Sequence, residues 1–434
     1  MGWCSSRNRV VSFSSRGVGW VMNILIIPTN DWIRAPGHGH IDFIAEELAE
    51  RGHRVYAWHF DLYRNEKIKR KPKRVKLIEP RKLWIRDPTV FFTANALLQA
   101  PAMFKAIRDL RIDVVINENI LNGLVAFLVS STQVLKVFDF SDYFPESASV
   151  YYLGSSIMKK IVEAVALTVT KLNIKFADTC LAVCHSLIET IRSIDNAKDC
   201  YLLTNGAETS EVCSHMNRKG QSNNLNPLNH TMIIMGVIDD WLDLITPLEA
   251  LEILSNRFPG IKIAIIGPWR KKEHKKRIQN FVESRGLHPH VEITGYVSSQ
   301  QLARYLSSAS CCIMPYKTDS FGSIIRLPEK LFVYSAYGKP ILSTPLPEVI
   351  TLRSEHVFFY HDVNAFVNIV STILSDATMR AELSAKANEF AQKYDLKLLA
   401  RKLEQILLDS LRKLRKIRYE GLRRRKDSAV RFAT

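Results

Sequence analysis

Two cations, Arg326 and Lys330, flank the proline that opens an expected helix in the second half of the chain. Proline suits the first helical turn, so Pro328 marks the start and Lys330 falls in the first turn. A cation is locally unfavourable beside the positive end of a helix dipole. Both side chains therefore need an anionic partner, which is either Glu329 or a bound phosphate.

A glycine-rich loop near the start of the chain, "APGHGHID", is a second candidate for anion binding. Gly37 and Gly39 allow close backbone approach, and a helix that begins near His40 points its N-terminus at the same place. His38 and His40 could act there as a base or as a hydrogen-bond donor to a phosphate. The alternative is a glycine turn with surface histidines.

Two aspartates lie at the end of an expected strand, in "FDFSDYFPE". Asp139 and Asp142 are three residues apart, a spacing that does not place both on one face of a strand. One of them therefore points to solvent or caps a helix. We select Asp142 as the catalytic candidate; a turn or helix cap is the alternative.

These residues follow strands of an alternating pattern. The runs "ILIIP", "RVYAWH", "IDVVINEN", "VLKVFDFSD" and "DTCLAVCHS" predict strands, and the positions of Ile41, Ile44, Ala45 and Leu48 predict the first helix. A second helix is expected over Pro101–Leu110. Alternation of this kind is typical of a parallel sheet covered by helices on both faces.

The alternation restarts after a polar stretch. Strands are expected at "TMIIMG", "IKIAIIGP", "HVEITGY", "SCCIMP" and "KPILST". The expected helices are Pro247–Arg257, Lys272–Arg285, Ser299–Ser308 and Pro328–Tyr337, followed by helices from Ala365 onward. The predicted fold is α/β, with two doubly wound, Rossmann-like parallel sheets facing a cleft.

Composition shifts set the expected boundaries. Residues 1–21 form an extension without the sustained apolar segment of a signal peptide. The first domain covers 22–213, a linker 214–230, and the second domain 231–395. Residues 396–434 form a helix with an apolar stripe, expected to pack on the body, and a basic tail.

The charge of the chain is localised. The net charge is +17, and it comes from residues 64–86, with eleven Lys/Arg and two Glu, and 412–434, with ten Lys/Arg and two acidic residues. Two basic stretches on a neutral body predict docking on an anionic surface, with a solvated face as the alternative. The stretches lack the interleaved aromatics of a nucleic-acid platform, so no nucleic acid is expected.

The remaining composition is that of a globular protein. Apolar residues make up 47% and charged residues 24% of the chain, which excludes disorder of the whole. No run of apolar residues is long enough to span a membrane without interruption. Seven cysteines without a second metal-spaced pair predict buried free thiols in a reducing compartment.

The order of these motifs resembles the retaining glycosyl transferases group 1, of the GT-B fold. "RLPEKLFVYSAYGKPILSTPLPE" is similar to the family's donor-site helix, and "VEITGYVSSQQLARYLSSASCCIMPY" to the segment before it. "PGHGHIDFIAEELAERGHRV", "LLTNGAE" and "MGVIDDWLD" resemble further family segments, so the likeness covers about residues 22–395.

The sequence departs from the family pattern at the donor site. The two glutamates of the family fall on Ile325 and Val333, so a carboxylate cannot hold the ribose at position 333. "DSFG", at 319–322, resembles the family's E-x-F-G but lies farther from the helix. The Arg and Lys that often follow the first strand of the second domain are missing, and Arg326 and Lys330 are the candidates to replace them as diphosphate ligands.

The resemblance implies a glycosyltransferase that uses a nucleoside diphosphate sugar, with retention and without a required cofactor or metal. Its donor-binding candidates here are Gly236, Gly267, Arg270, Phe321, Gly322, Ser323, Arg326 and Lys330. The acceptor, a glycan or lipid-linked molecule, is expected at Gly37, Gly39 and the catalytic candidates His38, His40 and Asp142. The expected location is cytoplasmic, peripheral on the membrane through 64–86 and 412–434. The alternatives are a nucleotide-sugar epimerase of this fold and an impaired binding protein.

Overall fold

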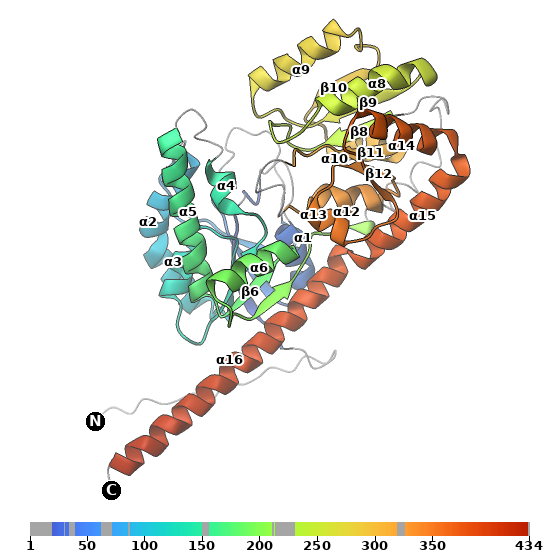
Figure 1. The fold of residues 1–434 in the computed structure, drawn as a ribbon. Helices are drawn as coiled ribbons and strands as arrows, with labels where there is room; N and C mark the ends of the chain where they lie inside the picture. The colour runs from blue at the N-terminus through green and yellow to red at the C-terminus, as the bar shows by residue number, and fades with distance from the viewer. Residues whose placement is uncertain are drawn as a thin grey trace.

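Two parallel sheets organise the chain (Figure 1). The computed structural model describes residues 20–29, 31–33, 40–61, 72–85, 87–149, 156–210, 212, 231–318 and 326–432. The first sheet has seven strands and the second has six, and each strand pairs in parallel with its neighbours. The predicted α/β fold of two doubly wound domains is confirmed.

The first sheet has the strand order β3-β2-β1-β4-β5-β6-β7. Its strands are β1 (Asn23–Ile27), β2 (Arg54–Trp58), β3 (Lys76–Ile78), β4 (Val114–Asn117), β5 (Leu135–Phe140), β6 (Thr179–Ala182) and β7 (Cys200–Leu202). The central strands are buried on both faces because helices cover each side, which is why they read as continuous apolar runs.

The first domain's helices divide between the faces of this sheet. They are α1 (His40–Glu50), α2 (Pro88–Asp109), α3 (Leu121–Val129), α4 (Phe144–Ser149), α5 (Ser156–Phe176) and α6 (His185–Ile194). Leu25 and Ile27 belong to the core that contains residues of α2 and α3, whereas Ile24 and Ile26 pack with residues of α1. The alternation follows from the two-residue period of strand side chains.

The predicted start of α2 at Pro101 was wrong. The helix begins at Pro88, where the Asp87 side chain accepts a hydrogen bond from the Val90 N–H, and it continues through Pro101. Pro101 lies on the exposed side, where its ring removes one backbone hydrogen bond but water can solvate the carbonyl left over. Among the described residues, α2 alone is long and apolar enough to cross a membrane by length and composition, with 33% of that window buried.

The second sheet has the order β10-β9-β8-β11-β12-β13. Its strands are β8 (Thr231–Met235), β9 (Lys262–Ile266), β10 (Val291–Gly295), β11 (Cys311–Met314), β12 (Ile341–Ser343) and β13 (Val357–Phe359). The helices are α8 (Ile245–Arg257), α9 (Lys272–Ser284), α10 (Ser299–Ser308), α12 (Glu329–Ala336), α13 (Pro347–Thr351), α14 (Val363–Ser375) and α15 (Ala377–Lys393). Except for the short α13, which was not predicted, they lie where the periodicity predicts helices, to within a few residues.

The last helix, α16 (Leu396–Phe432), returns from the second domain to the first (Figure 1). Leu403 and Leu407 are fully buried in one cluster with Ile24 of β1 and Leu48 of α1. The predicted packing of this apolar stripe is confirmed. Beyond Leu411 the helix continues through the basic stretch, so that part of the tail is helical.

Two further contacts join the domains near this crossing. Ala207 exchanges backbone hydrogen bonds with Tyr394 and Leu396, at 3.2 Å each, so the two chain crossings run side by side. The buried Glu348 of α13 accepts hydrogen bonds from the backbone N–H groups of His185 (3.3 Å) and Ser186 (2.7 Å) at the start of α6. A carboxylate at a helix N-terminus is favoured by the dipole.

The five cysteines within the described residues are all free, as predicted. Cys180, Cys184, Cys311 and Cys312 are buried, and Cys200 is half-buried beside Cys180 on the neighbouring strand. Burial raises the pKa of the Cys311 and Cys184 thiols to about 12, so both are neutral packing groups.

Candidate functional site

Two glycines bring the ends of β8 and β9 into contact. Gly236 (φ +115°) and Gly267 (φ +138°) lie in a backbone region that side chains rarely adopt. A Cβ at position 267 would lie 1.9 Å from the Gly236 carbonyl oxygen, so only glycine permits the approach. Both predicted donor-site glycines therefore shape the carboxyl edge of the second sheet, where doubly wound folds bind ligands.

Backbone hydrogen bonds join three loops at this edge. The Arg270 N–H donates to the Ile238 carbonyl (3.0 Å), which ties the loop after β9 to the loop after β8. The Lys317 N–H donates to the Trp241 carbonyl (2.9 Å), which ties the loop after β11 to the same loop. The residue stretch 238–242 is thereby fixed between the other two loops.

Aromatic rings from these loops face the predicted cations. The guanidinium carbon of Arg270 lies 4.8 Å from the centroid of the Trp241 ring, and that of Arg326 lies 5.8 Å from it. Arg326 is also 5.3 Å from the centroid of the Tyr316 ring, and the Lys330 Nζ donates a hydrogen bond to the Tyr316 hydroxyl at 3.2 Å. The three cations are thus gathered around two aromatic side chains.

Lys330 extends across the turn at Gly236. A Cβ built there would be 2.3 Å from the Lys330 Cε and 2.6 Å from its Nζ. Lys330 lies in the first turn of α12, whose N-cap residue, Pro328, provides no side-chain hydrogen bond to the helix. Among the residues that the structure describes, neither Arg326 nor Lys330 forms an ion pair, so Glu329 is not their partner there.

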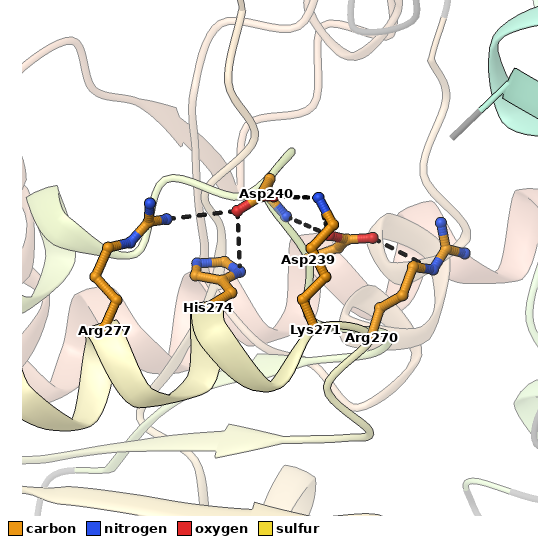
Figure 2. Close-up of polar contacts among 6 residues, drawn as sticks. All are labelled: Asp239, Asp240, Arg270, Lys271, His274 and Arg277. Atoms are coloured by element: carbon orange, nitrogen blue, oxygen red, sulfur yellow. Dashed lines mark hydrogen bonds and ion pairs between the residues drawn. The ribbon is translucent and has the colours of Figure 1, made fainter. Parts of the chain in front are cut away.

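An acidic pair holds the cations of the neighbouring loop, as Figure 2 shows. The buried Asp239 lies 3.3 Å from the Arg270 Nε and 4.0 Å from the Lys271 Nζ. Asp240 lies 2.5 Å from the Lys271 Nζ and 3.4 Å from an Arg277 nitrogen. The hydrogen bond from Lys271 lowers the pKa of Asp240, so this carboxylate stays ionised.

His274 completes this cluster from the first turn of α9. Its Nδ1 is 3.5 Å from an Asp240 carboxylate oxygen, and burial lowers its pKa, so the ring is neutral near pH 7. Ligand atoms of Asp239, Asp240 and His274 lie within 4.8 Å of one another. Three cationic side chains already neutralise these carboxylates, so the set fits an ion-pair network better than a metal site.

The first-domain candidates are only partly described. Gly37, His38 and Gly39 lie outside the described residues, and of His40 the structure describes the backbone, as the first residue of α1. Asp142 is exposed beyond β5, where its Oδ1 accepts a hydrogen bond from the Tyr143 N–H (2.9 Å), while Asp139 is buried within the strand. The expected divergence of the two aspartates is confirmed.

A cavity of about 500 Å³ opens between α4 and α5, and its lining begins at Tyr143, the residue after Asp142. Its lining residues are Tyr143, Pro145, Lys159, Lys160, Glu163, Ala164 and Leu167. Lys159 Nζ lies 3.7 Å from the carboxylate of Glu163, which leaves Lys160 as the unbalanced positive charge of this lining. Sequence reasoning missed this cavity because α5 carries no motif that sets its lysines apart from a solvated face.

The remaining donor-site residues differ in how far the structure describes them and in whether the sequence predicted them. Phe321, Gly322, Ser323 and Ile325 lie outside the described residues. Val333 is half-buried on α12 and packs against the core. Trp241 and Tyr316 were not selected from the sequence, although the segment "DDWLD" and the end of "CCIMPY" contain them.

The second half of the chain is similar to known proteins. Residues 217–390 match the family model described as "Glycosyl transferases group 1". A segment of 72 residues is 32% identical to the teichuronic acid biosynthesis glycosyltransferase TuaH of Bacillus subtilis. That segment covers 17% of this chain and 18% of TuaH, so the chain matches under a fifth of the length of that relative.

Solved structures share the whole fold. Sucrose-phosphate synthase of Thermosynechococcus elongatus has a TM-score of 0.66 and 16% identity, over 89% of this chain and 98% of that one. Anabaena HepE, solved in complex with UDP, has a TM-score of 0.62 and 15% identity, over 89% and 100%. WaaG, from lipopolysaccharide biosynthesis, has a TM-score of 0.59 and 14% identity, over 88% and 99%. At these identities the likeness establishes the GT-B architecture.

Proposed function

Because residues 217–390 match the family model of the glycosyl transferases group 1, we propose that the chain transfers a sugar from a nucleoside diphosphate donor. The donor binds at the carboxyl edge of the second sheet, and the acceptor binds at the first domain. Since HepE was solved with UDP, a uridine diphosphate sugar is the first donor to test.

One observation carries the proposal. Arg326 and Lys330 converge beside the N-terminus of α12, and among the described residues they contact aromatic rings rather than carboxylates. Two cations beside a helix N-terminus that has no side-chain cap favour a ligand with two or more negative charges. The diphosphate of a nucleotide sugar has that charge.

The same cations would act in the transfer step. When the sugar leaves, negative charge develops on the diphosphate, and fixed positive groups aimed there stabilise the transition state. Arg326 and Lys330 supply such charge from one side, and Arg270, held by Asp239, supplies it from the neighbouring loop. We propose that the reaction retains configuration and that His38, His40 or Asp142 acts from the acceptor side.

The acceptor is proposed to be a glycan or a lipid-linked molecule. The names of TuaH and WaaG refer to the biosynthesis of teichuronic acid and of lipopolysaccharide. The cavity with Lys159 and Lys160 beside Asp142 suits an acceptor that carries phosphate. The enzyme would then work as a peripheral protein on the cytoplasmic face of a membrane.

A panel of radiolabelled nucleotide sugars, each with and without lipid-linked and polysaccharide acceptors, tests this function. Transfer of label to an acceptor is the expected result. Conversion of a free nucleotide sugar without acceptor would show an epimerase instead. Nucleotide binding without turnover would show an impaired binding protein, as the apolar side chain of Val333 in place of a carboxylate allows.

A further inference from the structure

Helix α2 presents an apolar stripe to solvent. Val90, Leu97, Leu98 and Phe104 are 50%, 74%, 49% and 50% exposed, although α2 packs closely on α3 through its other side. The stripe is one face of the helix, since these residues recur near helical spacing. Scattered exposed leucines are ordinary on a protein surface, but a continuous stripe marks an interaction site.

Helix α5 presents a second stripe. Ile157, Met158, Ile161 and Val165 are 71%, 44%, 50% and 52% exposed. They lie opposite the face that is buried through Val162, Ala166 and Thr170. Helix α5 therefore has apolar residues on its core face and also on its outer face, and the outer face is not buried within this domain.

The two stripes lie on one side of the first domain. Helix α3 packs against both α2 and α5, and its Leu128 is 57% exposed. Figure 1 shows α2, α3 and α5 together on the side away from the second domain. Leu83 and Trp84, each 51% exposed, precede α2. We call this surface of α2, α3, α5 and residues 83–84 the apolar face.

Cations lie beside the apolar face. Arg81, Lys105 and Arg108 are exposed next to the α2 stripe, and Lys159 and Lys160 lie beside Ile157 and Ile161 on α5. Arg108 pairs with Asp109 (3.0 Å) and Lys159 with Glu163 (3.7 Å), so the excess of positive charge comes from the other three cations. A tryptophan with lysines and arginines around aliphatic side chains is the composition of a surface that enters the interfacial region of a bilayer. The positive rim complements anionic lipid headgroups.

We propose that the apolar face docks the protein on an anionic lipid bilayer, with the aliphatic side chains in the interface and the cations among the headgroups. Helix α2 lies on the membrane rather than across it. Its Asn95 and Gln99 are buried and hydrogen-bonded to residues 81 and 83 and to Trp58, which anchors this helix in the domain.

The proposed docking places the cavity between α4 and α5 close to the membrane surface. Lys159 and Lys160 line that cavity and neighbour the α5 stripe, so its opening lies close to the headgroups. An acceptor that is anchored in the bilayer and carries a phosphate could enter it without leaving the membrane. This consequence depends on the proposed glycosyltransferase function, whereas the docking itself does not.

Vesicle sedimentation of the full chain tests the docking. Vesicles of phosphatidylglycerol and phosphatidylcholine in equal parts are compared with pure phosphatidylcholine, at low and high salt. We expect sedimentation with the anionic vesicles, part of which persists at high salt because apolar contacts are not screened. The double variant Leu97→Glu, Ile161→Glu should weaken this binding at least about tenfold, since two apolar contacts are lost and two repelled charges are added.

A matched variant controls for charge and fold. Ile253→Glu places the same change at a residue that is 40% exposed on α8 of the second domain, and it should bind vesicles as the unaltered protein does. Unaltered vesicle binding by the double variant, or recovery of the unaltered protein in the supernatant with both vesicle types, would overturn the proposal. If the unaltered protein forms dimers without lipid and the double variant is monomeric, the apolar face binds a second copy of the chain instead.

Nucleotide affinity separates this proposal from the proposed function. The double variant should bind nucleoside diphosphate as the unaltered protein does, because the apolar face contains none of the donor-site residues. If the protein binds vesicles but has no transferase activity, the docking proposal stands and the proposed function is wrong. If the double variant transfers sugar to a lipid acceptor at the rate of the unaltered protein, the docking proposal is wrong and the proposed function stands.

Discussion

Lys330 is the residue on which nucleotide affinity should depend most. Its ammonium group contacts the Tyr316 hydroxyl and no carboxylate among the described residues. Removing one charge-assisted contact costs roughly 1.5–3 kcal/mol of binding. Lys330→Ala should therefore weaken nucleoside diphosphate affinity about tenfold or more, as measured by calorimetry.

Lys386→Ala is the control, because Lys386 is exposed on α15 and pairs with Glu355 (2.5 Å) away from this site. Equal affinities for the two folded variants would remove Lys330 from the donor site.

Gly236 tests the same contact from the opposite side. An alanine Cβ there would overlap the Lys330 Cε, and the positive φ adds strain of about 1–2 kcal/mol. Because a lysine end can move, Gly236→Ala should displace the ammonium group and reduce nucleotide affinity, with a modest loss of stability. Isothermal calorimetry alongside urea unfolding separates the two effects. Normal affinity in the folded variant would show that Lys330 does not need its position over the turn.

At this scale the sequence predicts charges better than it predicts their surroundings. Pro328 made the first turn of α12 recognisable, and the dipole argument then singled out Arg326 and Lys330. Trp241 and Tyr316 could not be assigned in the same way, because their roles depend on backbone hydrogen bonds between loops far apart in the chain. Asp239 is buried by that pairing as well, so nothing local distinguishes it from a turn aspartate.

Helix α16 offers the clearest test among the elements. Leu403 is fully buried against the first domain, whereas Leu398 is 46% exposed on the same helix. Leu403→Ala should lower the free energy of unfolding by about 2–5 kcal/mol through lost burial and a cavity. Leu398→Ala should change it by less than about 0.5 kcal/mol. Urea unfolding of both variants checks this, and equal midpoints would mean that α16 adds no stability to the first domain.

Elements with strong periodicity were predictable, whereas several of the short ones were not. Helix α10 has the predicted bounds, Ser299–Ser308, because a capping box at Ser298 and Gln301 fixes its start. Strands β3 and β13, three residues each, were not predicted, since they become strands only by pairing with a neighbour. Pro101 was misread for a related reason: its position on the exposed side of α2 is a tertiary property.

The stability of the whole protein should fall in mild acid. Burial lowers the pKa of His356 to about 4 from an ordinary 6.5, while its Nε2 lies 2.7 Å from the Ser335 Oγ. Below pH 6.5 the unfolded chain takes up a proton that the folded chain refuses until about pH 4, so stability is full above 6.5 and is lost as the pH falls. Between pH 7 and about pH 5 the loss should reach about 2 kcal/mol.

Urea midpoints measured across that range check this expectation, with His356→Gln as the comparison. The variant should be less stable at pH 7 but should lose less on acidification. A parallel decline in both proteins would assign the pH dependence to other groups.

The basic end of α16 should control the part of membrane binding that salt can remove. The cations Arg423, Arg424, Arg425 and Lys426 lie within the helical tail. Each cation near an anionic surface contributes about 1 kcal/mol, an attraction that salt screens. Replacing these four with Gln should reduce vesicle binding at low salt and leave the salt-resistant part unchanged. Loss at both salt concentrations would assign the apolar contacts to the tail as well.

The return of α16 to β1 and α1 also sets an order of events during synthesis. The first domain's strands leave the ribosome early, but the apolar surface around Ile24 and Leu48 has no cover until Leu403 and Leu407 have been made. At about 5–20 residues per second, translation of the intervening second domain takes on the order of ten seconds or more. A nascent chain therefore carries an open hydrophobic surface for that interval, and we expect ribosome-associated chaperones to bind it.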